Sequence, residues 1–570
     1  TMFASLAKPS ATGKSMKVLF IFLVLLYAAL LLINPQLGPN DEFAFLSTLQ
    51  SGKVFPMYWM NDFPYYNDLS GGRFGPLGGQ EYNVVALFSH SPMAYFAFNA
   101  AQILLFAASF VFIIREYSTS KALIYLAGTL VLLTPGFTLV FFKLLHPEKN
   151  VLFFLSLFFA SYLLFQKRQQ TIYFIFALLC ANVAIYYKEP VFMAVATFAA
   201  GHLLLSWKTS NRKAKLLDGL LIGSAALYAG TYLIMVMPNL GPSIYLSDAA
   251  DTNILVLLKA VLNYTFFSDP LPILVLIPLL LWRLFRVFGG RDQAHPVLDP
   301  MAAAGVVYTS VFFVLKLYSP YYLLPVYLFA LPPIFYFLQK GALRGVFWAA
   351  SFSITAFVLV VNAIPIAVHY VAYYKYVPIN FNKTMDFLVD DINRRYAGQR
   401  SNIFFYGVDR GSHAYFITGE YLRFKGLSIR KFDLKSDMEA RNPNPPGWKA
   451  SPFDRPEDID AVDPQHTYKY PHLPLSVYQP GPLFSIQRGD YLVVSPESLK
   501  NYDREYIENL KKDYDLIFYT QSPLSVPLVG LKTFVKYLLL QELSPTQKAS
   551  GVILNENLLH WPDYYVFVRK

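Results

Sequence analysis

Long apolar runs alternate with short polar connections over the first two thirds of the chain. About 17–25 apolar residues are needed to cross the hydrocarbon core of a bilayer, and the sequence contains eleven candidate segments of this kind. They cover approximately residues 18–34, 92–114, 121–142, 151–166, 171–187, 190–207, 216–237, 271–288, 301–318, 321–339 and 345–369. The fourth to sixth are short and closely joined, which leaves the count open by one. The pattern predicts a polytopic α-helical membrane protein of about eleven spans.

The composition supports a membrane protein and argues against other classes. Hydrophobic residues make up 55% of the 570 residues and charged residues only 15%, too little polar surface to cover a soluble globule. The net charge of +11 lies in short clusters between apolar runs and forms no continuous stripe, so we exclude a nucleic-acid partner. The single cysteine, Cys180, lies inside an apolar run, which excludes a disulfide framework and a cysteine metal site.

The distribution of lysine and arginine predicts the orientation, because these residues are in excess in cytoplasmic connections. Up to residue 369, one set of connections holds sixteen basic residues: Lys8, Lys14, Lys17, Arg115, Lys121, Lys167, Arg168, Lys208, Arg212, Lys213, Lys215, Arg283, Arg286, Arg291, Lys340 and Arg344. The opposite set holds seven: Lys53, Arg73, Lys143, Lys149, Lys188, Lys259 and Lys316. The first set is predicted to be cytoplasmic. The N-terminus is then inside, with an uncleaved first span, and everything after residue 370 is outside.

Two regions outside the bilayer are large. The first is the outer loop at about 35–91, in which Asp41–Gln50 fits a short surface helix. The second is the tail at 371–570, which we interpret as an extracytoplasmic α/β domain following the transmembrane module 1–370. Its expected strands are 402–407, 491–495, 516–520 and 564–568, its expected helices are 380–396 and 498–511, and it carries a Pro-rich insertion at 441–487. Residues 524–540 are amphipathic; we expect them to pack on the domain, and the alternative is that they graze the membrane.

A carboxylate pair, Asp41 and Glu42, lies just past the first apolar segment. It indicates a base that acts beside the bilayer. Neither a P-loop nor a nucleotide-binding Gly-x-Gly-x-x-Gly unit is present, and we interpret the glycines at 71–79 as a mobile loop. The alternative role for Asp41 is to cap the juxtamembrane helix, and the two roles are compatible.

Three motifs in this order resemble a known class. They are Asn40-Asp41-Glu42-Phe43-Ala44-Phe45-Leu46 after the first span, His90-Ser91-Pro92-Met93-Ala94-Tyr95-Phe96 entering the second, and Lys316-Leu317-Tyr318-Ser319-Pro320-Tyr321-Tyr322-Leu323-Leu324-Pro325 near the last spans. The chain resembles the GT-C class of integral-membrane glycosyltransferases, in the branch of lipid A aminoarabinose transferases and protein O-mannosyltransferases. The motifs are short, and the tail is matched only as an outer α/β domain.

The resemblance implies a polyprenyl-phosphate-linked sugar as donor and an inverting transfer to a hydroxyl of a glycan, lipid or protein at a bacterial inner membrane. Asp41, or Glu42 as the near alternative, is then the base that deprotonates the acceptor hydroxyl. The departing lipid phosphate needs fixed cations, for which the outer-side candidates are Lys316, Lys188, Lys143, His146 and Arg73. Tyr318, Tyr322 and His90 are further motif residues expected at the site.

Other interpretations stay open at this point. Lysines in turns such as 146–149 and 187–190 are often snorkelling anchors with no ligand. The sequence requires no cofactor, and metal dependence is open, because Asp62, Asp68, Asp248 and Asp251 are available beside Asp41 without a diagnostic spacing. The rival functions are a lipid-linked sugar transporter or flippase, and an O-antigen ligase or polymerase. The spans hold almost no midplane charge and no inverted repeat, which disfavours a transporter, and the large loop follows the first span, which is unlike the ligases.

Overall fold

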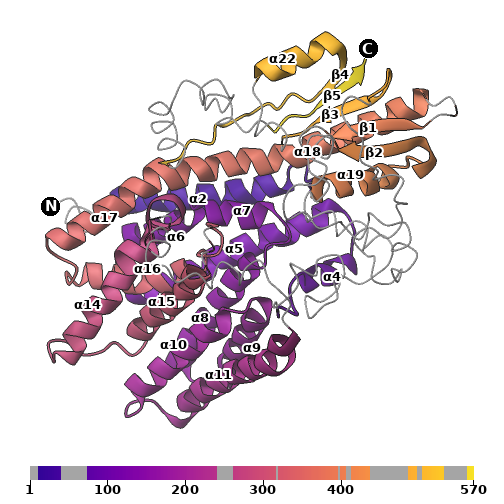
Figure 1. The fold of residues 1–570 in the computed structure, drawn as a ribbon. Coiled ribbons are helices and arrows are strands. Elements are labelled where there is room, and N and C mark those ends of the chain that lie inside the picture. The colour runs from indigo at the N-terminus through magenta and orange to yellow at the C-terminus, as the bar shows by residue number, and fades with distance from the viewer. Residues whose placement is uncertain are drawn as a thin grey trace.

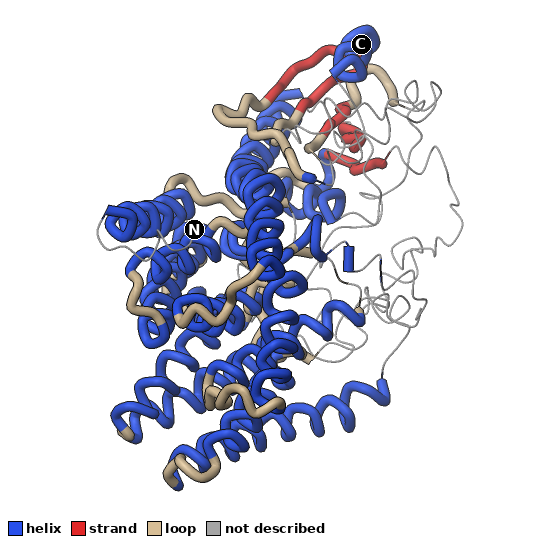
Figure 2. The backbone as a smooth tube through the Cα atoms, turned by 90° about the vertical axis from the view of Figure 1, so that its left-hand side faces the viewer, coloured by secondary structure: helices blue, strands red, loops and turns tan. Residues whose placement is uncertain are grey.

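The computed structural model shows a bundle of helices with a small sheet at one end (Figure 1). It describes residues 11–39, 74–239, 258, 261–262, 264–315, 317, 319–395, 398, 400–405, 413–436, 486–496, 504–531 and 562–570. The strands, red in Figure 2, gather beyond one end of the helices.

The bundle is built from helices whose bounds follow the apolar runs. They are α2 (Ala11–Leu32), α5 (Pro92–Tyr117), α6 (Lys121–Leu132), α7 (Pro135–Phe142), α8 (Glu148–Arg168), α9 (Thr171–Tyr187), α10 (Val191–Ser206), α11 (Arg212–Thr231), α14 (Ile277–Phe288), α15 (Leu298–Val314), α16 (Val326–Gln339), α17 (Val346–Val358) and α18 (Ile364–Arg395), with the short α4 (Gln80–Ala86) beside them. Short π-helical segments are η2 (Tyr232–Val236), η4 (Tyr264–Ser268), η5 (Pro272–Leu276) and η6 (Leu359–Ala363), and η3 (Met237–Asn239) is a 3₁₀ helix. Each of the eleven predicted segments contains helix.

Five of the described helices are long and apolar enough to cross a membrane, or six if one bent pair counts as a single span. Thr171–Tyr187, Val191–Ser206, Leu298–Val314 and Val326–Gln339 are apolar but shorter. The protein is therefore largely helical with several apolar helices, and the count of eleven spans stays a prediction.

Two of the predicted spans are not continuous helices over their whole predicted length. The segment 121–142 is two helices, α6 and α7, at 58° to each other. The break occurs because Thr134 caps α7 by accepting the N–H of Phe137, and Pro135 opens the helix. The segment 321–339 begins with turns, and helix starts only at Val326, after Pro325.

The last apolar run does not stop near residue 369. Residues Val346–Arg395 form a single helix of 50 residues, so the separate helix expected at 380–396 is instead the end of α18. Polar side chains on this helix have tertiary partners: Lys375 donates to the carbonyl oxygen of Leu30 at 2.8 Å, and Asn382 donates to that of Leu37 at 3.1 Å. These contacts hold the end of α2 and the chain that follows it against α18.

The C-terminal sheet has five strands in the order β2-β1-β3-β5-β4. They are β1 (Ser401–Phe405), β2 (Phe432–Ser436), β3 (Tyr491–Val494), β4 (Tyr514–Tyr519) and β5 (Tyr565–Arg569). β1 pairs in parallel with β2 and β3, while β5 pairs antiparallel with β3 and β4. The four predicted strands are confirmed; β2 was missed, because Asp433 and Lys435 interrupt its apolar residues.

Alternate side chains of the sheet pack on opposite faces, as the pleat requires. On one face Phe404, Leu492 and Phe567 form a core with α22 (Arg504–Asp513). On the other, Phe405 and Val493 join the main core shared with α18 and α19 (His413–Phe424). The predicted helix at 498–511 corresponds to α22, and the surface helix at Asp41–Gln50 and residues 441–485 of the Pro-rich insertion lie outside the described residues.

A buried polar trio ties three helices together inside the bundle. The hydroxyl of Tyr162 (α8) donates to Asp218 (α11) at 2.8 Å and lies 2.7 Å from Nδ1 of His202 (α10), which itself lies 2.7 Å from Asp218. All three are buried. Because each polar atom in a dry core is costly without a partner, the trio fixes how these helices face one another.

Candidate functional site

Two charged turns meet at the end of the bundle that lies nearer the sheet. One joins α7 to α8, contains His146 and ends at Glu148, the first residue of α8, and the other joins α9 to α10 and contains Lys188. Pro147 and Pro190 stand directly before α8 and α10, where a fixed φ near −65° suits the start of a helix. The sequence thus places a charged residue beside each helix end.

Lys188 and Glu148 form a salt bridge between the two turns. Their side chains are only 8% and 1% exposed. Burying two charges costs several kcal/mol per ion before their attraction is counted, so such a pair persists only where the surroundings fix it. Oε2 of Glu148 lies 4.0 Å from Nδ1 of His146 and has no hydrogen-bond partner among the described residues.

Aromatic rings form one wall of this cluster. The ammonium group of Lys188 lies 4.5 Å from the ring centroid of Tyr322, and it also faces Phe312 and Tyr321 at 5.7 and 6.0 Å. The ring of His146 lies 4.7 Å from that of Tyr321. Both tyrosines belong to the Tyr-Tyr-Leu-Leu-Pro motif, which is thereby brought to the charged turns.

The backbone before that motif approaches α7 closely. A Cβ on Gly136 would lie 2.6 Å from the carbonyl oxygen of Pro320, a contact that real Cβ atoms do not make. Gly136 is therefore required for the motif to pack against α7.

The cluster has a positive character at His146. Burial first, and then the charges of Lys143, Lys149 and Lys188, lower the pKa of His146 well below its usual value. The imidazole is therefore neutral at pH 7. The lysine charges, the smaller part of this effect, also attract an anion, whereas burial opposes any charge. Lys143 and His146 are partly exposed, whereas Lys149 and Lys188 are buried beneath them.

A second buried network lies next to the first. Lys149 donates to the Tyr82 hydroxyl and to the carbonyl oxygen of Leu144. Glu81 accepts from Asn150 at 2.6 Å and from the Tyr187 hydroxyl at 3.0 Å. Burial raises the pKa of Glu81, and Lys149 and these hydrogen bonds oppose the rise. The network anchors α4 to the starts of the two charged turns.

The glycine-rich segment is fixed against the same turns from Phe74 onward. The N–H of Phe74 donates to Glu189 at 3.0 Å, and the N–H of Leu77 donates to the carbonyl oxygen of Tyr186 at 3.2 Å. A Cβ on Gly75 would lie 3.0 Å from the carbonyl oxygen of Tyr187. The interpretation of 71–79 as a mobile loop was wrong for residues 74–79, because close backbone packing explains the glycine there.

The segment between α2 and Pro39, which precedes Asp41 and Glu42 in the sequence, starts near this cluster. Lys143 lies 5.1 Å from the ring centroid of Tyr374, and the next residue of α18, Lys375, holds the carbonyl oxygen of Leu30. Asn382, which accepts from the Tyr421 hydroxyl of α19, holds Leu37. The C-terminal end of α2 and Lys143 therefore contact neighbouring residues of α18, Lys375 and Tyr374. The described chain continues from α2 to Pro39.

The structure brings together some of the predicted site residues. Lys188, His146 and Tyr322 meet in one cluster, with Lys143 acting on His146. His90 is exposed at the start of α5 and makes no contact with the charged turns among the described residues. The remaining candidates, Asp41, Glu42, Arg73, Lys316 and Tyr318, and the possible metal ligands Asp62, Asp68, Asp248 and Asp251, lie outside the described residues.

Sequence reasoning did not select Glu81 and Glu148 as site residues. The available signal was an acid beside a span end in a chain with few acids, but the same signal fits a solvated turn. Within the described part of the chain, no group of three His, Cys, Asp or Glu residues is arranged to hold a metal ion.

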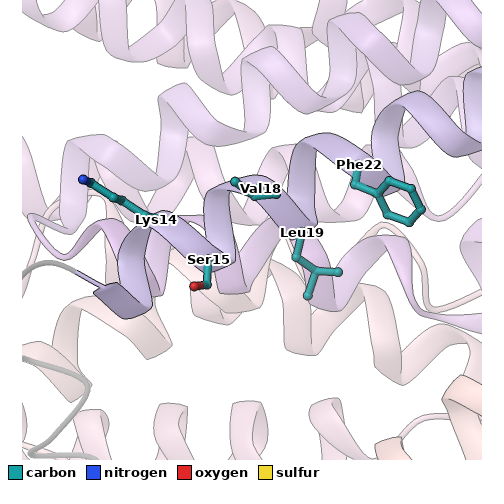
Figure 3. A pocket seen from close by; sticks show the side chains of 5 residues that line it. All are labelled: Lys14, Ser15, Val18, Leu19 and Phe22. Carbon is teal, nitrogen blue, oxygen red and sulfur yellow. The ribbon is translucent and has the colours of Figure 1, made fainter.

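A shallow hollow of about 450 Å³ lies elsewhere, on the exposed side of α2. It is lined by Lys14, Ser15, Val18, Leu19 and Phe22 (Figure 3). Lys375 meets the opposite end of α2, about 24 Å away at a rise of 1.5 Å per residue from Lys14 to Leu30. The hollow is therefore separate from the charged turns.

Comparison with solved structures finds membrane glycosyltransferases. The chain is similar to ArnT from Cupriavidus metallidurans bound to undecaprenyl phosphate, at 14% identity and a TM-score of 0.40, over 89% of this chain and 97% of that chain. The apo state of the same protein matches at 15% identity and a TM-score of 0.42, with the same coverage. The archaeal oligosaccharyltransferase AglB from Archaeoglobus fulgidus, in complex with an inhibitory peptide and a dolichol-phosphate, matches at 12% identity and a TM-score of 0.38, over 89% of this chain and 73% of that chain.

No protein-family model and no curated protein sequence matches the chain. ArnT is a lipid A aminoarabinose transferase, and both neighbours are GT-C glycosyltransferases, which is the class that the sequence motifs resemble. At identities of 12–15% and TM-scores of 0.38–0.42, these similarities assign neither an activity nor a site residue to this chain.

Proposed function

We propose that this protein is an inverting glycosyltransferase that moves a sugar from a polyprenyl-phosphate donor to a hydroxyl acceptor at the outer face of a bacterial inner membrane. The observation that carries the proposal is the positive, aromatic-walled cluster at His146 and Lys188, which shares a level of α18 with the chain leading to Asp41. Cations at the edge of the bilayer can bind the phosphate of a lipid carrier, and the faces of aromatic rings can pack against its sugar.

The residues would divide the reaction as follows. Asp41, or Glu42, accepts the proton of the acceptor hydroxyl as its oxygen attacks the anomeric carbon. The bond between that carbon and the phosphate oxygen breaks, and polyprenyl phosphate leaves with the bonding electrons. Lys143, which is partly exposed, reaches the phosphate directly, and His146, whose Nε2 is buried, and Lys188 lie behind it. Lys316, Arg73 and Tyr318 are assigned to the donor end on the motif alone.

Attack from the face opposite the leaving phosphate inverts the anomeric centre. The acceptor is a glycan, lipid or protein of the cell envelope, and the donor sugar is set by contacts beyond the phosphate. No cofactor takes part in this scheme, and a divalent metal would assist only by binding the phosphate.

The test is transfer by the purified full chain in proteoliposomes. The donor is a synthetic polyprenyl phosphate carrying a radiolabelled sugar, and the acceptor source is a solubilised envelope fraction containing lipid, glycan and protein. We expect label to move into an acceptor while polyprenyl phosphate is released in equal amount, with the opposite anomeric configuration in the product. Parallel reactions with a chelator measure metal dependence.

Two outcomes contradict the proposal. Label that stays on the polyprenyl carrier but crosses the vesicle membrane would make the protein a transporter or flippase. Label that leaves the carrier with retained configuration would rule out the single-displacement mechanism.

A further inference from the structure

A non-helical segment after β4 runs back along the last long helix. We call residues Ser522–Leu531, of which only Leu531 is helical, the strap. Its hydrogen bonds to that helix are Asn380 Nδ2 to the Ser522 hydroxyl at 2.8 Å, His369 Nδ1 to the Val526 carbonyl oxygen at 2.6 Å, and the N–H of Leu531 to Asn362 Oδ1 at 2.9 Å. The strap thus runs antiparallel to the helix, away from the sheet (Figure 1).

If the last span enters the membrane at Gly345, as the sequence predicts, the far end of the strap falls within the membrane core. Arg344 is the last charged residue before this helix, and the next on the helix is Lys375. Asn362 stands seventeen residues after Gly345, which is about 25 Å along the axis at 1.5 Å per residue. The hydrocarbon core is about 30 Å thick, and a tilted helix would leave Asn362 still deeper below the sheet-side surface. Val526, beside His369, is at the interface, and Leu531 is inside.

Part of the strap has its backbone polar groups satisfied without water. Non-helical backbone at membrane depth is tolerated only where its polar groups find partners in protein. Pro523 and Pro527 have no N–H to satisfy, and the N–H of Val529 donates to the Pro527 carbonyl oxygen at 3.0 Å. Asn362 and His369, two buried polar residues of this span, supply further partners.

The strap also approaches the helix too closely for a side chain at one position. A Cβ on Gly530 would lie 2.8 Å from Asn362 Oδ1 and 3.1 Å from Ile366 Cδ1. Contact of this kind holds the strap on the helix surface while other side chains point away. Leu524 is 51% exposed and Val529 48%, and the span itself carries exposed apolar side chains at Phe357, Val361 and Val368.

We propose that the far end of the strap inserts into the leaflet next to the C-terminal sheet, where Val529 contacts lipid acyl chains. The sheet is then attached to the membrane at two places, through α18 and through the strap. This proposal does not depend on the proposed function.

The experiment places single cysteines in a Cys180→Ser background and labels them with an environment-sensitive fluorophore. The labelled full chain is reconstituted in vesicles that contain phospholipid with a nitroxide on the acyl chain. We expect Val529→Cys to be quenched several-fold more by the acyl nitroxide than by aqueous iodide. Glu508→Cys, on the exposed face of α22, should show the reverse order. A Val529 label quenched by iodide as strongly as the Glu508 label would overturn the proposal.

A second pair of variants tests the docking contact. Gly530→Ala should shift the Val529 label toward iodide quenching, because the added methyl group collides with Asn362. Gly223→Ala, whose Cβ would meet nothing within 4 Å, is the matched control and should leave the quenching unchanged. Equal quenching in both variants would contradict a strap held on the span by Gly530.

Discussion

The ammonium group of Lys188 lies 4.5 Å from the centroid of the Tyr322 ring. This contact joins the α9–α10 turn to a motif more than a hundred residues away in the chain. A cation over an aromatic face gains about 0.5–2 kcal/mol, depending on desolvation. It keeps the ammonium group at the wall of the cluster even though Glu148 also holds it.

Lys188 is expected to have a role in binding that is separable from its salt bridge. Lys188→Met alone leaves Glu148 buried and unpaired, which should cost about 3–5 kcal/mol of stability. In the double variant Lys188→Met with Glu148→Gln, melting in detergent should recover toward wild type while the donor titration still shows weakened binding. Wild-type donor affinity in the double variant would make Lys188 purely structural.

Asp41 is expected to act in chemistry more than in binding. Asp41→Asn should reduce turnover by roughly 10²–10⁴, the usual contribution of a general base, with donor affinity little changed. Single-turnover transfer and a donor titration measure the two effects. The proposed mechanism fails if Asp41→Asn and Glu42→Gln are both fully active.

Lys316 is expected to contribute positive charge at the donor phosphate. Lys316→Ala should weaken donor binding or turnover far more than Lys259→Ala, a control predicted to lie on the same side of the membrane. Lys316→Arg should keep part of the activity, since it keeps the charge with a different geometry. If donor titrations of Lys316→Ala and wild type coincide, the phosphate is bound elsewhere, and Lys188 with Lys143 is the next pair to test.

The lowered pKa of His146 predicts that the folded protein loses stability in acid. The folded protein holds the pKa of His146 well below its usual value, whereas the unfolded chain takes up a proton below about pH 6.5. Unfolding therefore gains a proton as pH falls below that value, at up to about 1.4 kcal/mol per pH unit. Melting temperatures between pH 8 and 5 should fall more steeply for wild type than for His146→Gln. Parallel curves would show that His146 titrates normally.

The orientation can be tested from outside the cell. Single cysteines at 60–80 or after 400, in the Cys180→Ser background, are expected to react with an impermeant thiol reagent in intact cells. The physical reason is the excess of sixteen over seven basic residues. Labelling at a cysteine beside Lys213 would invert the predicted topology.

The sequence was sufficient for features that depend on local pattern. Apolar runs predicted where helices lie, and short β-branched or aromatic runs predicted four of the five strands. The strand β2 was missed, because pairing with β1 and burial of Leu434 decide it, and neither is visible in a run containing Asp433 and Lys435.

Contacts between residues far apart in the sequence could not be predicted. Lys188 and His146 were singled out as charged residues in turns, but nothing local shows that Glu148 pairs with one and approaches the other. The expectation that 524–540 packs on the C-terminal domain was incomplete for the strap, which lies along the last long helix. An amphipathic pattern was read over 524–540, but residues 524–530 are irregular, with Pro527 and tertiary hydrogen bonds to the long helix, and helix begins only at Leu531.

The unbroken helix from Val346 to Arg395 couples the bundle to the sheet rotationally. Each residue of an α-helix turns the chain by about 100° and advances it by about 1.5 Å. A single residue inserted between the Lys375 and Asp391 positions would therefore swing the sheet about a quarter-turn around the axis. Tyr491, whose hydroxyl reaches Asp391 at 2.8 Å, would then face away from its acceptor. The length of this segment therefore sets the rotational angle between the helix bundle and the sheet.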